Sequence, residues 1–287
     1  MIQEPGWADL CDVAQAPAET IPQRGTHSIM DADRQIYYEH PLTERVRTFL
    51  RLEFLFKSTL HYLKGRTLWD SRAALQGMLE ILSILGRNDL KAELLKELER
   101  HASNLAALRE RPGVDRQRLA ELLQKLTSLT ESLYGSSAQF ALELRENDFL
   151  ASIRQRSAIP GGTCEFDMPG YHYWLQQEPD TRYCQLRGWF DVFEPLYQPI
   201  TLILFLIRQS AEALPTRAER GFFQQNLDPN TPCLLMRVAL PADARHFPEI
   251  SGGRHRFTIR FWEQESPVAR AIQTARDVDF GLACCAG

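Results

Sequence analysis

The chain has 287 residues and a formal net charge of −4, and 44% of its residues are hydrophobic against 24% charged. This balance is typical of a globular protein and excludes collagen-like, mucin-like and wholly disordered chains. The pI of about 6.0 argues against a dedicated nucleic-acid binder, for which a value above about 9 is usual.

Two features of the chain bear on its location. It begins MIQEPGWADLCD, without the basic and apolar regions of a signal peptide. Its longest apolar run, residues 200–207, has eight residues, which is far short of the ~20 that span a bilayer. We therefore expect a cytoplasmic protein without membrane insertion.

The first 39 residues differ from the rest of the chain. They carry seven acidic residues, two arginines and three prolines, and they sustain no apolar period. A segment of this composition does not bury enough apolar surface to fold by itself. We interpret residues 1–36 as an acidic, disordered tail.

Residues 37–213 have apolar side chains three and four residues apart, which is the spacing of amphipathic helices. Pro41 suits the first position of a helix, and Asp70 or Ser71 suits an N-cap. Gly86 suits a helix end. We expect helices over about 41–64, 71–85, 88–108, 115–133 and 139–154, a short one within 168–176, and two more within 181–211, where Pro195 and Pro199 interrupt the pattern.

After Pro215, apolar and polar residues alternate with the period of two that is typical of strands. We expect strands over 217–226, 234–240, 256–261 and 278–285. Short strands in succession, without long helices between them, favour a small antiparallel sheet. The predicted fold class is therefore α+β, with an N-terminal helical bundle domain (37–213) and a smaller antiparallel β-rich C-terminal domain (214–287).

Motifs of catalysis and nucleotide binding do not occur, because the sequence contains no GxxxxGK[ST], GxGxxG, HExxH or GxSxG. The six cysteines include no CxxC pair, so we expect reduced thiols rather than a disulfide framework. Cys164, His172 and Cys184 are not spaced like the ligands of a zinc module. We expect no catalytic residue, no metal site and no cofactor.

Two features indicate binding. The aromatic run from Tyr171 to Trp174 suits a binding cleft, although a packed helix end is the more common setting for such a run. A set of arginines would suit an acidic or extended peptide if they faced one groove, and they are otherwise solvated surface charges. They are Arg87, Arg145, Arg154, Arg156, Arg208, Arg217, Arg220, Arg254, Arg256 and Arg260.

Several blocks of the sequence are long and unusual. They are YEHPLTERVRTFLRLE (38–53), ELLKELER (93–100), PGVD (112–115), RQRSAIPGG (154–162), FDMP through WL (166–175), LIRQSA (206–211), PEISG (248–252), RFTIRF (256–261) and ACC (283–285). Together, and in this order, they resemble the ZapD family, the Z-ring-associated proteins D of bacterial cell division. The resemblance runs from about residue 37 to residue 285 without large gaps.

The resemblance implies a non-enzymatic cytoplasmic protein that forms a homodimer. It implies binding to the C-terminal tail of the tubulin-like GTPase FtsZ and cross-linking of FtsZ filaments into bundles at the midcell division ring. Cationic residues in a cleft between the two domains are implicated in that contact. The residues that we expect to bind FtsZ are Arg87, Arg208, Arg217, Arg220, His172 and Trp174.

Two other functions are weighed against this one. A nucleic-acid or other acidic-partner binding module would use the basic segment 40–66 and the arginines of the strands, and its affinity would fall steeply with salt. The low pI and the lack of a motif lead us to expect no nucleic acid. An enzyme would use a cleft around His172 and Cys164.

Overall fold

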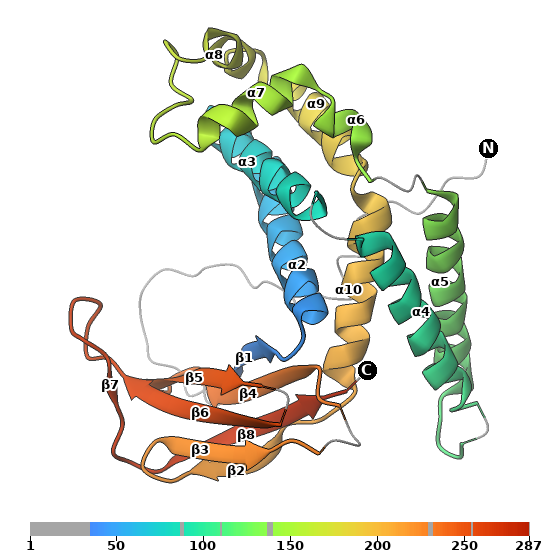
Figure 1. The fold of residues 1–287 in the computed structure, drawn as a ribbon, viewed down its shortest axis with the longest axis vertical. Helices are drawn as coiled ribbons and strands as arrows, with labels where there is room; N and C mark the ends of the chain where they lie inside the picture. Colours follow the sequence, from blue (N-terminus) through green and yellow to red (C-terminus); the bar gives the residue numbers. More distant parts are fainter. Residues whose placement is uncertain are drawn as a thin grey trace, which may run out of the picture.

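The computed structural model describes residues 35–86, 89–109, 111–136, 140–228, 232–253 and 255–286. Its described helices lie towards the N-terminus and most strands towards the C-terminus, and the strands pair antiparallel (Figure 1). The predicted α+β class is thereby confirmed. Of the predicted tail, residues 1–34 lie outside the described residues, and Gln35 and Ile36 begin a strand.

Capping residues set the helix boundaries. The hydroxyl of Thr67 accepts a hydrogen bond from the N–H of Asp70, and the Asp70 carboxylate accepts one from the N–H of Thr67. The N-cap is therefore Thr67, three or four residues before the predicted N-cap, Asp70 or Ser71. The described helices are α2 (Glu44–Leu63), α3 (Leu68–Leu85), α4 (Leu90–Ala106), α5 (Arg116–Gly135), α6 (Leu142–Arg145), α7 (Asp148–Ser157), α8 (Pro169–Leu175), α9 (Pro179–Asp191) and α10 (Glu194–Gln209).

Two predicted helices differ in the structure. The helix expected from Pro41 begins at Glu44, and Pro41 is the last residue of strand β1 (Gln35–Pro41). The helix expected over 139–154 is divided into α6 and α7, because Asn147 starts a new helix by accepting a hydrogen bond from the N–H of Leu150 (3.0 Å).

α10 lies at the centre of the helical layer. It packs against α2, α4 and α5, and its C-terminal end contacts β8. Ile200, Ile203 and Ile207 are fully buried along it. In the part of the chain that the structure describes, no single helix is long and apolar enough to cross a bilayer, and only α9 and α10 taken together, bent by 63°, reach that length and composition.

Two sheets pack face to face below the helices (Figure 1). The first has the strand order β1-β4-β8-β2, and the second has the order β3-β6-β5 with β7 beside β6. Between them, Phe261 of β6 contacts Phe280 of β8, with ring centroids 5.0 Å apart. The strands after β1 are β2 (Leu214–Ala218), β3 (Phe222–Asn226), β4 (Leu235–Pro241), β5 (His246–Gly252), β6 (Arg256–Glu263), β7 (Ile272–Gln273) and β8 (Val278–Cys285).

The segment 217–226, predicted as one strand, contains the turn of a hairpin formed by β2 and β3. Arg220 and Gly221 have positive φ angles of 50° and 70°, and the N–H of Phe222 donates to the carbonyl of Glu219 (2.9 Å). Two such residues form the turn that matches the twist of paired strands. Because β2 pairs with β8 and β3 with β6, this turn also joins the two sheets.

One cysteine pair is oxidised in the structure. A disulfide joins Cys233, just before β4, to Cys284 in β8, whereas Cys164, Cys184 and Cys285 are free. The prediction of reduced thiols was wrong for the bonded pair. The two cysteines are 51 positions apart, and only the pairing of β4 with β8 makes them neighbours.

Candidate binding site

Arg208, near the end of α10, joins the helical layer to the first sheet. Its guanidinium donates two hydrogen bonds to Glu39 of β1 and two to Glu53 of α2, each 2.8 Å long. Arg237 of β4 donates to the same Glu39 carboxylate (3.1 Å). These four residues, which we call the junction network, connect β1, α2, α10 and β4.

The junction network is charged and mostly shielded from water. Burial by itself raises the pKa of Glu53, but hydrogen bonds and charges from Arg208 and Lys57 outweigh it and hold that pKa below its ordinary value. Burial likewise lowers the pKa of Arg208, and the carboxylates of Glu53 and Glu39 raise it above its ordinary value. The charge of Arg208 is thus offset by two carboxylates within the protein.

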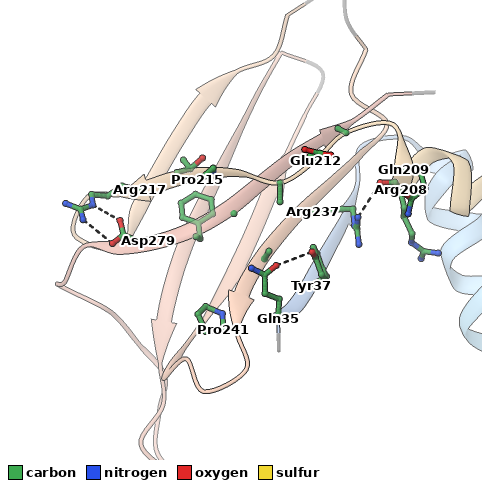
Figure 2. A pocket seen from close by; sticks show the side chains of 16 residues that line it. Gln35, Tyr37, Arg208, Gln209, Glu212, Pro215, Arg217, Arg237, Pro241 and Asp279 are labelled. Carbon is green, nitrogen blue, oxygen red and sulfur yellow. Dashed lines mark hydrogen bonds and ion pairs between the residues drawn. The ribbon is translucent and has the colours of Figure 1, made fainter. Parts of the chain in front are cut away.

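A pocket of about 830 Å³ lies beside this network, over the outer face of the first sheet (Figure 2). Ala239 of β4 and Gly281 of β8, which are paired, contribute small residues to its lining. Arg208 and Arg217, two of the predicted arginines, both line it. We call this hollow the sheet pocket.

The predicted arginines of the sheet pocket already have partners. Arg217 donates two hydrogen bonds to Asp279 (2.7 and 3.0 Å), as Figure 2 shows, and these bonds lower the pKa of Asp279. Arg208 belongs to the junction network. Arg220 does not line the pocket; it lies in the β2–β3 turn, where its backbone N–H donates to Asp277 (2.9 Å). Arg87 lies outside the described residues.

His172 and Trp174 lie on α8, at the opposite end of the molecule from the sheets (Figure 1). Trp174 is 6% exposed, stacks on Tyr171 and Trp189 and donates its indole N–H to Gln185 (2.6 Å). It is therefore part of a packed helix end. His172 is partly exposed, with Nδ1 3.7 Å from a carboxylate oxygen of Glu165. The structure does not bring this pair together with Arg208 and Arg217.

A second hollow, which sequence reasoning missed, lies between α2 and α3. It has a volume of about 590 Å³. α2 lines it with apolar and cationic side chains, and α3 lines it with Glu80, Ser83 and Ile84. Phe54 is 70% exposed there, and Arg51 is exposed and makes no ion pair with any described residue. We call it the helix groove. Its lining residues are Pro41, Arg47, Leu50, Arg51, Phe54, Leu55, Glu80, Ser83 and Ile84.

A signal for this groove was present in the sequence. Arg47, Arg51 and Phe54 are four and three residues apart, so one side of α2 carries them all. The buried stripe of α2, which includes Phe49 and Phe56, lies elsewhere around the helix. An exposed phenylalanine one turn after an arginine is an apolar anchor with a cation beside it, and this arrangement suits a peptide with apolar and acidic residues.

Within the described ranges, no three His, Cys, Asp or Glu side chains gather as metal ligands. The thiol of Cys164 donates to Asp167 (3.5 Å), and His172 lies nearest to Glu165. The two residues that an enzyme was expected to use therefore have separate carboxylate partners.

The described residues form an α+β protein with two surface hollows, the sheet pocket and the helix groove. A family model described as ZapD, cell division protein, matches residues 50–260. Over 251 residues the chain is 43% identical to the cell division protein ZapD of Methylococcus capsulatus, covering 88% of this chain and 98% of that protein. ZapD of Dechloromonas aromatica is 39% identical over 250 residues, with 87% and 99% covered. The chain belongs to the ZapD family of cell division proteins.

Proposed function

We propose that this protein is a cytoplasmic homodimer that binds the C-terminal tail of FtsZ. By doing so it cross-links FtsZ filaments into bundles and promotes assembly of the division ring at midcell. The observation that carries the proposal is the 43% identity to a cell division protein ZapD along almost the whole length of that relative. Two copies of the chain would supply two filament sites without any further sequence.

We place the FtsZ tail in the helix groove. Phe54 and Leu50 offer an apolar anchor. Arg51 makes no ion pair with a described residue, and the one carboxylate in the groove lining, Glu80, accepts a hydrogen bond from Gln76. Arg87 follows Ile84, which lines the groove, by three residues in the sequence. We therefore keep Arg87 as a proposed contact. A short peptide that orders on binding has modest affinity at each site, and contacts to exposed arginines weaken with salt.

The remaining predicted residues have different roles in this proposal. Arg208 holds the junction network, and Trp174 packs the end of the helical layer. Arg217, Arg220 and His172 are exposed to different degrees on other surfaces, and they remain secondary candidates for contact with FtsZ.

The test is co-pelleting with FtsZ polymers, using FtsZ with and without its C-terminal tail. We expect pelleting and bundles only when the tail is present. The variant Arg51→Glu with Phe54→Ala should lose both, since it removes the free cation and the apolar anchor. Arg118→Glu is the matched control, because Arg118 is an exposed arginine on α5 without an ion pair to the described residues.

Two outcomes would contradict the proposal at different levels. Normal bundling by the folded double variant would reject the helix groove and leave FtsZ binding standing. A folded wild-type protein that pellets with neither form of FtsZ would reject the function itself.

A further inference from the structure

The outer face of the second sheet carries cations and aromatic rings side by side. Strand β6 alternates, with Phe257, Ile259 and Phe261 buried between the sheets. The residues between them point outwards. The register sets Phe222 of β3 and Glu249 of β5 on either side of Arg260, and Phe247 of β5 beside Trp262. We call this surface the arginine face, and define it by Phe222, Phe247, Arg256, Arg260 and Trp262.

The two arginines of this face are available for binding. Both are exposed, and neither makes an ion pair with any described residue, unlike Arg208 and Arg217. The neighbouring carboxylate, Glu249, accepts a hydrogen bond from the indole N–H of Trp262 (3.1 Å). Free guanidinium groups beside aromatic rings bind carboxylates and stack on further rings.

The N-terminal segment leaves the described fold beside this sheet. β1 begins at Gln35, which pairs with Pro241 at the end of β4. The chain then turns from Pro241 into β5 at His246, and β5 is an edge strand of the second sheet. Contacts between β1 and β5 keep these two strands together. The residues before Gln35 are therefore attached to β1, which lies next to β5 at the edge of the arginine face.

The composition of that segment complements the arginine face. Residues 1–34 contain six acidic residues and two arginines. Residues 4–13, EPGWADLCDV, hold three of the acids around Trp7 and no basic residue. The 21 residues between Val13 and Gln35 can span up to about 70 Å, whereas β6, with eight residues, is about 27 Å long. Residues 4–13 can thus reach every part of the face.

We propose that residues 4–13 dock on the arginine face of the same chain. The carboxylates of this stretch pair with Arg256 and Arg260, and Trp7 packs against the exposed phenylalanine rings. Each ion pair contributes little to the binding free energy, because both of its charges are exposed to solvent. Tethering compensates, since a linker of this length keeps the segment at an effective concentration near the millimolar range. This interaction is independent of FtsZ and of the helix groove.

Carboxylate-to-lysine cross-linking of the full chain tests the proposal. We would prepare R256K, R260K and, as a matched control, R118K, and treat each with a carbodiimide that joins only touching carboxylates and amines. Mass spectrometry then locates the links. We expect links from Glu4, Asp9 or Asp12 to positions 256 and 260, at least tenfold more abundant than links to position 118. In about 0.5 M salt they should largely disappear, because the screening length falls to a few ångströms.

Three results would overturn the proposal. Links to position 118 as abundant as those to 256 and 260 would mean random encounter. The absence of links at 256 and 260, in variants whose circular dichroism matches the wild type, would mean that the segment does not visit the face. If, in addition, a fluorescent single-stranded oligonucleotide bound the full chain and R256E/R260E abolished that binding, the face would belong to nucleic acid instead.

Discussion

At the scale of single residues, two arginines of the sheet pocket have contrasting surroundings. Arg208 is mostly buried between Glu39 and Glu53, while Arg217 and Asp279 are both exposed. Removal of one partner from a buried ion pair leaves an uncompensated charge in a poorly hydrated site. Removal of one partner from an exposed pair leaves a charge that water solvates.

Substitution of these arginines should therefore affect stability very differently. We expect Arg208→Ala to lower the free energy of unfolding by about 3–5 kcal/mol. Arg217→Ala should change it little, because water solvates the Asp279 carboxylate that is left behind. Urea unfolding at neutral pH measures both. Equal losses would show that the junction network does not hold the sheet to the helices.

A buried histidine on α4 makes stability depend on pH. Burial, followed by the charge of Arg100, lowers the pKa of His101 to about 4, against a smaller opposing effect of Glu97. The folded state therefore keeps His101 neutral between pH 6.5 and 4, while the unfolded state binds the proton. The stabilisation that the neutral His101 gives to the folded state is fully present above pH 6.5 and is lost as the pH falls towards 4.

We expect this loss to reach about 3 kcal/mol, because each unit of pKa shift corresponds to about 1.4 kcal/mol. His101→Gln cannot titrate, so its free energy of unfolding should fall less steeply over that range. Urea midpoints at pH 7, 6, 5 and 4.5 compare the two proteins. Parallel pH profiles would assign the acid sensitivity to other groups, with the carboxylates of the junction network as the next candidates.

At the scale of elements, α2 and α3 approach closely where Gly77 faces Thr59. A Cβ added at Gly77 would lie 2.2 Å from the Thr59 hydroxyl, and Thr59 is 1% exposed. Gly188, inside α9, has no such neighbour within 4 Å. The same change, glycine to alanine, therefore meets packed side chains in one helix and open space in the other.

We expect Gly188→Ala to stabilise the protein by about 0.5–1 kcal/mol, since alanine is the better helix former. Gly77→Ala should destabilise it by about 1–3 kcal/mol, because overpacking outweighs helix propensity. Thermal unfolding of the two variants measures whether each one is more or less stable than the wild type. A stabilised Gly77→Ala variant would mean that α2 and α3 separate easily, and the helix groove between them would then be adjustable.

Helices were predicted well because their apolar spacing is local information. The positions of α4 and α5 follow from leucines three and four residues apart, and Asp115 marks the start of α5 in both the sequence and the structure. β1 was missed because its partner, β4, lies near the other end of the chain. The β2–β3 turn was missed because Arg220, rather than a second glycine, occupies a position with positive φ.

At the scale of the whole molecule, cross-linking of filaments requires two sites on one particle. Suppose that intact and groove-defective subunits pair at random in the proposed dimer. The fraction of dimers with two intact sites is then the square of the fraction of intact subunits. A mixture of equal amounts should therefore retain about a quarter of the two-site dimers. Dimers with one site would bind filaments without joining them.

We expect bundling, followed by light scattering, to fall with the square of the intact fraction. Binding, followed by pelleting, should fall more gradually. The defective subunit is Arg51→Glu with Phe54→Ala, co-expressed with the wild type so that mixed dimers form. Bundling that falls in direct proportion to the intact subunit would indicate that each chain joins filaments on its own.

The sequence by itself determined the α+β class, most helices, the strands β4, β6 and β8 and the resemblance to ZapD, because these depend on local periodicity and on blocks of residues in order. Only the tertiary structure decided the surroundings of each charge. It placed Arg208 between carboxylates from β1 and α2, buried Trp174 in a helix end and left Arg51 without a partner among the described residues. A charge becomes a binding site only when nothing inside the protein neutralises it, and that depends on neighbours that are distant in sequence.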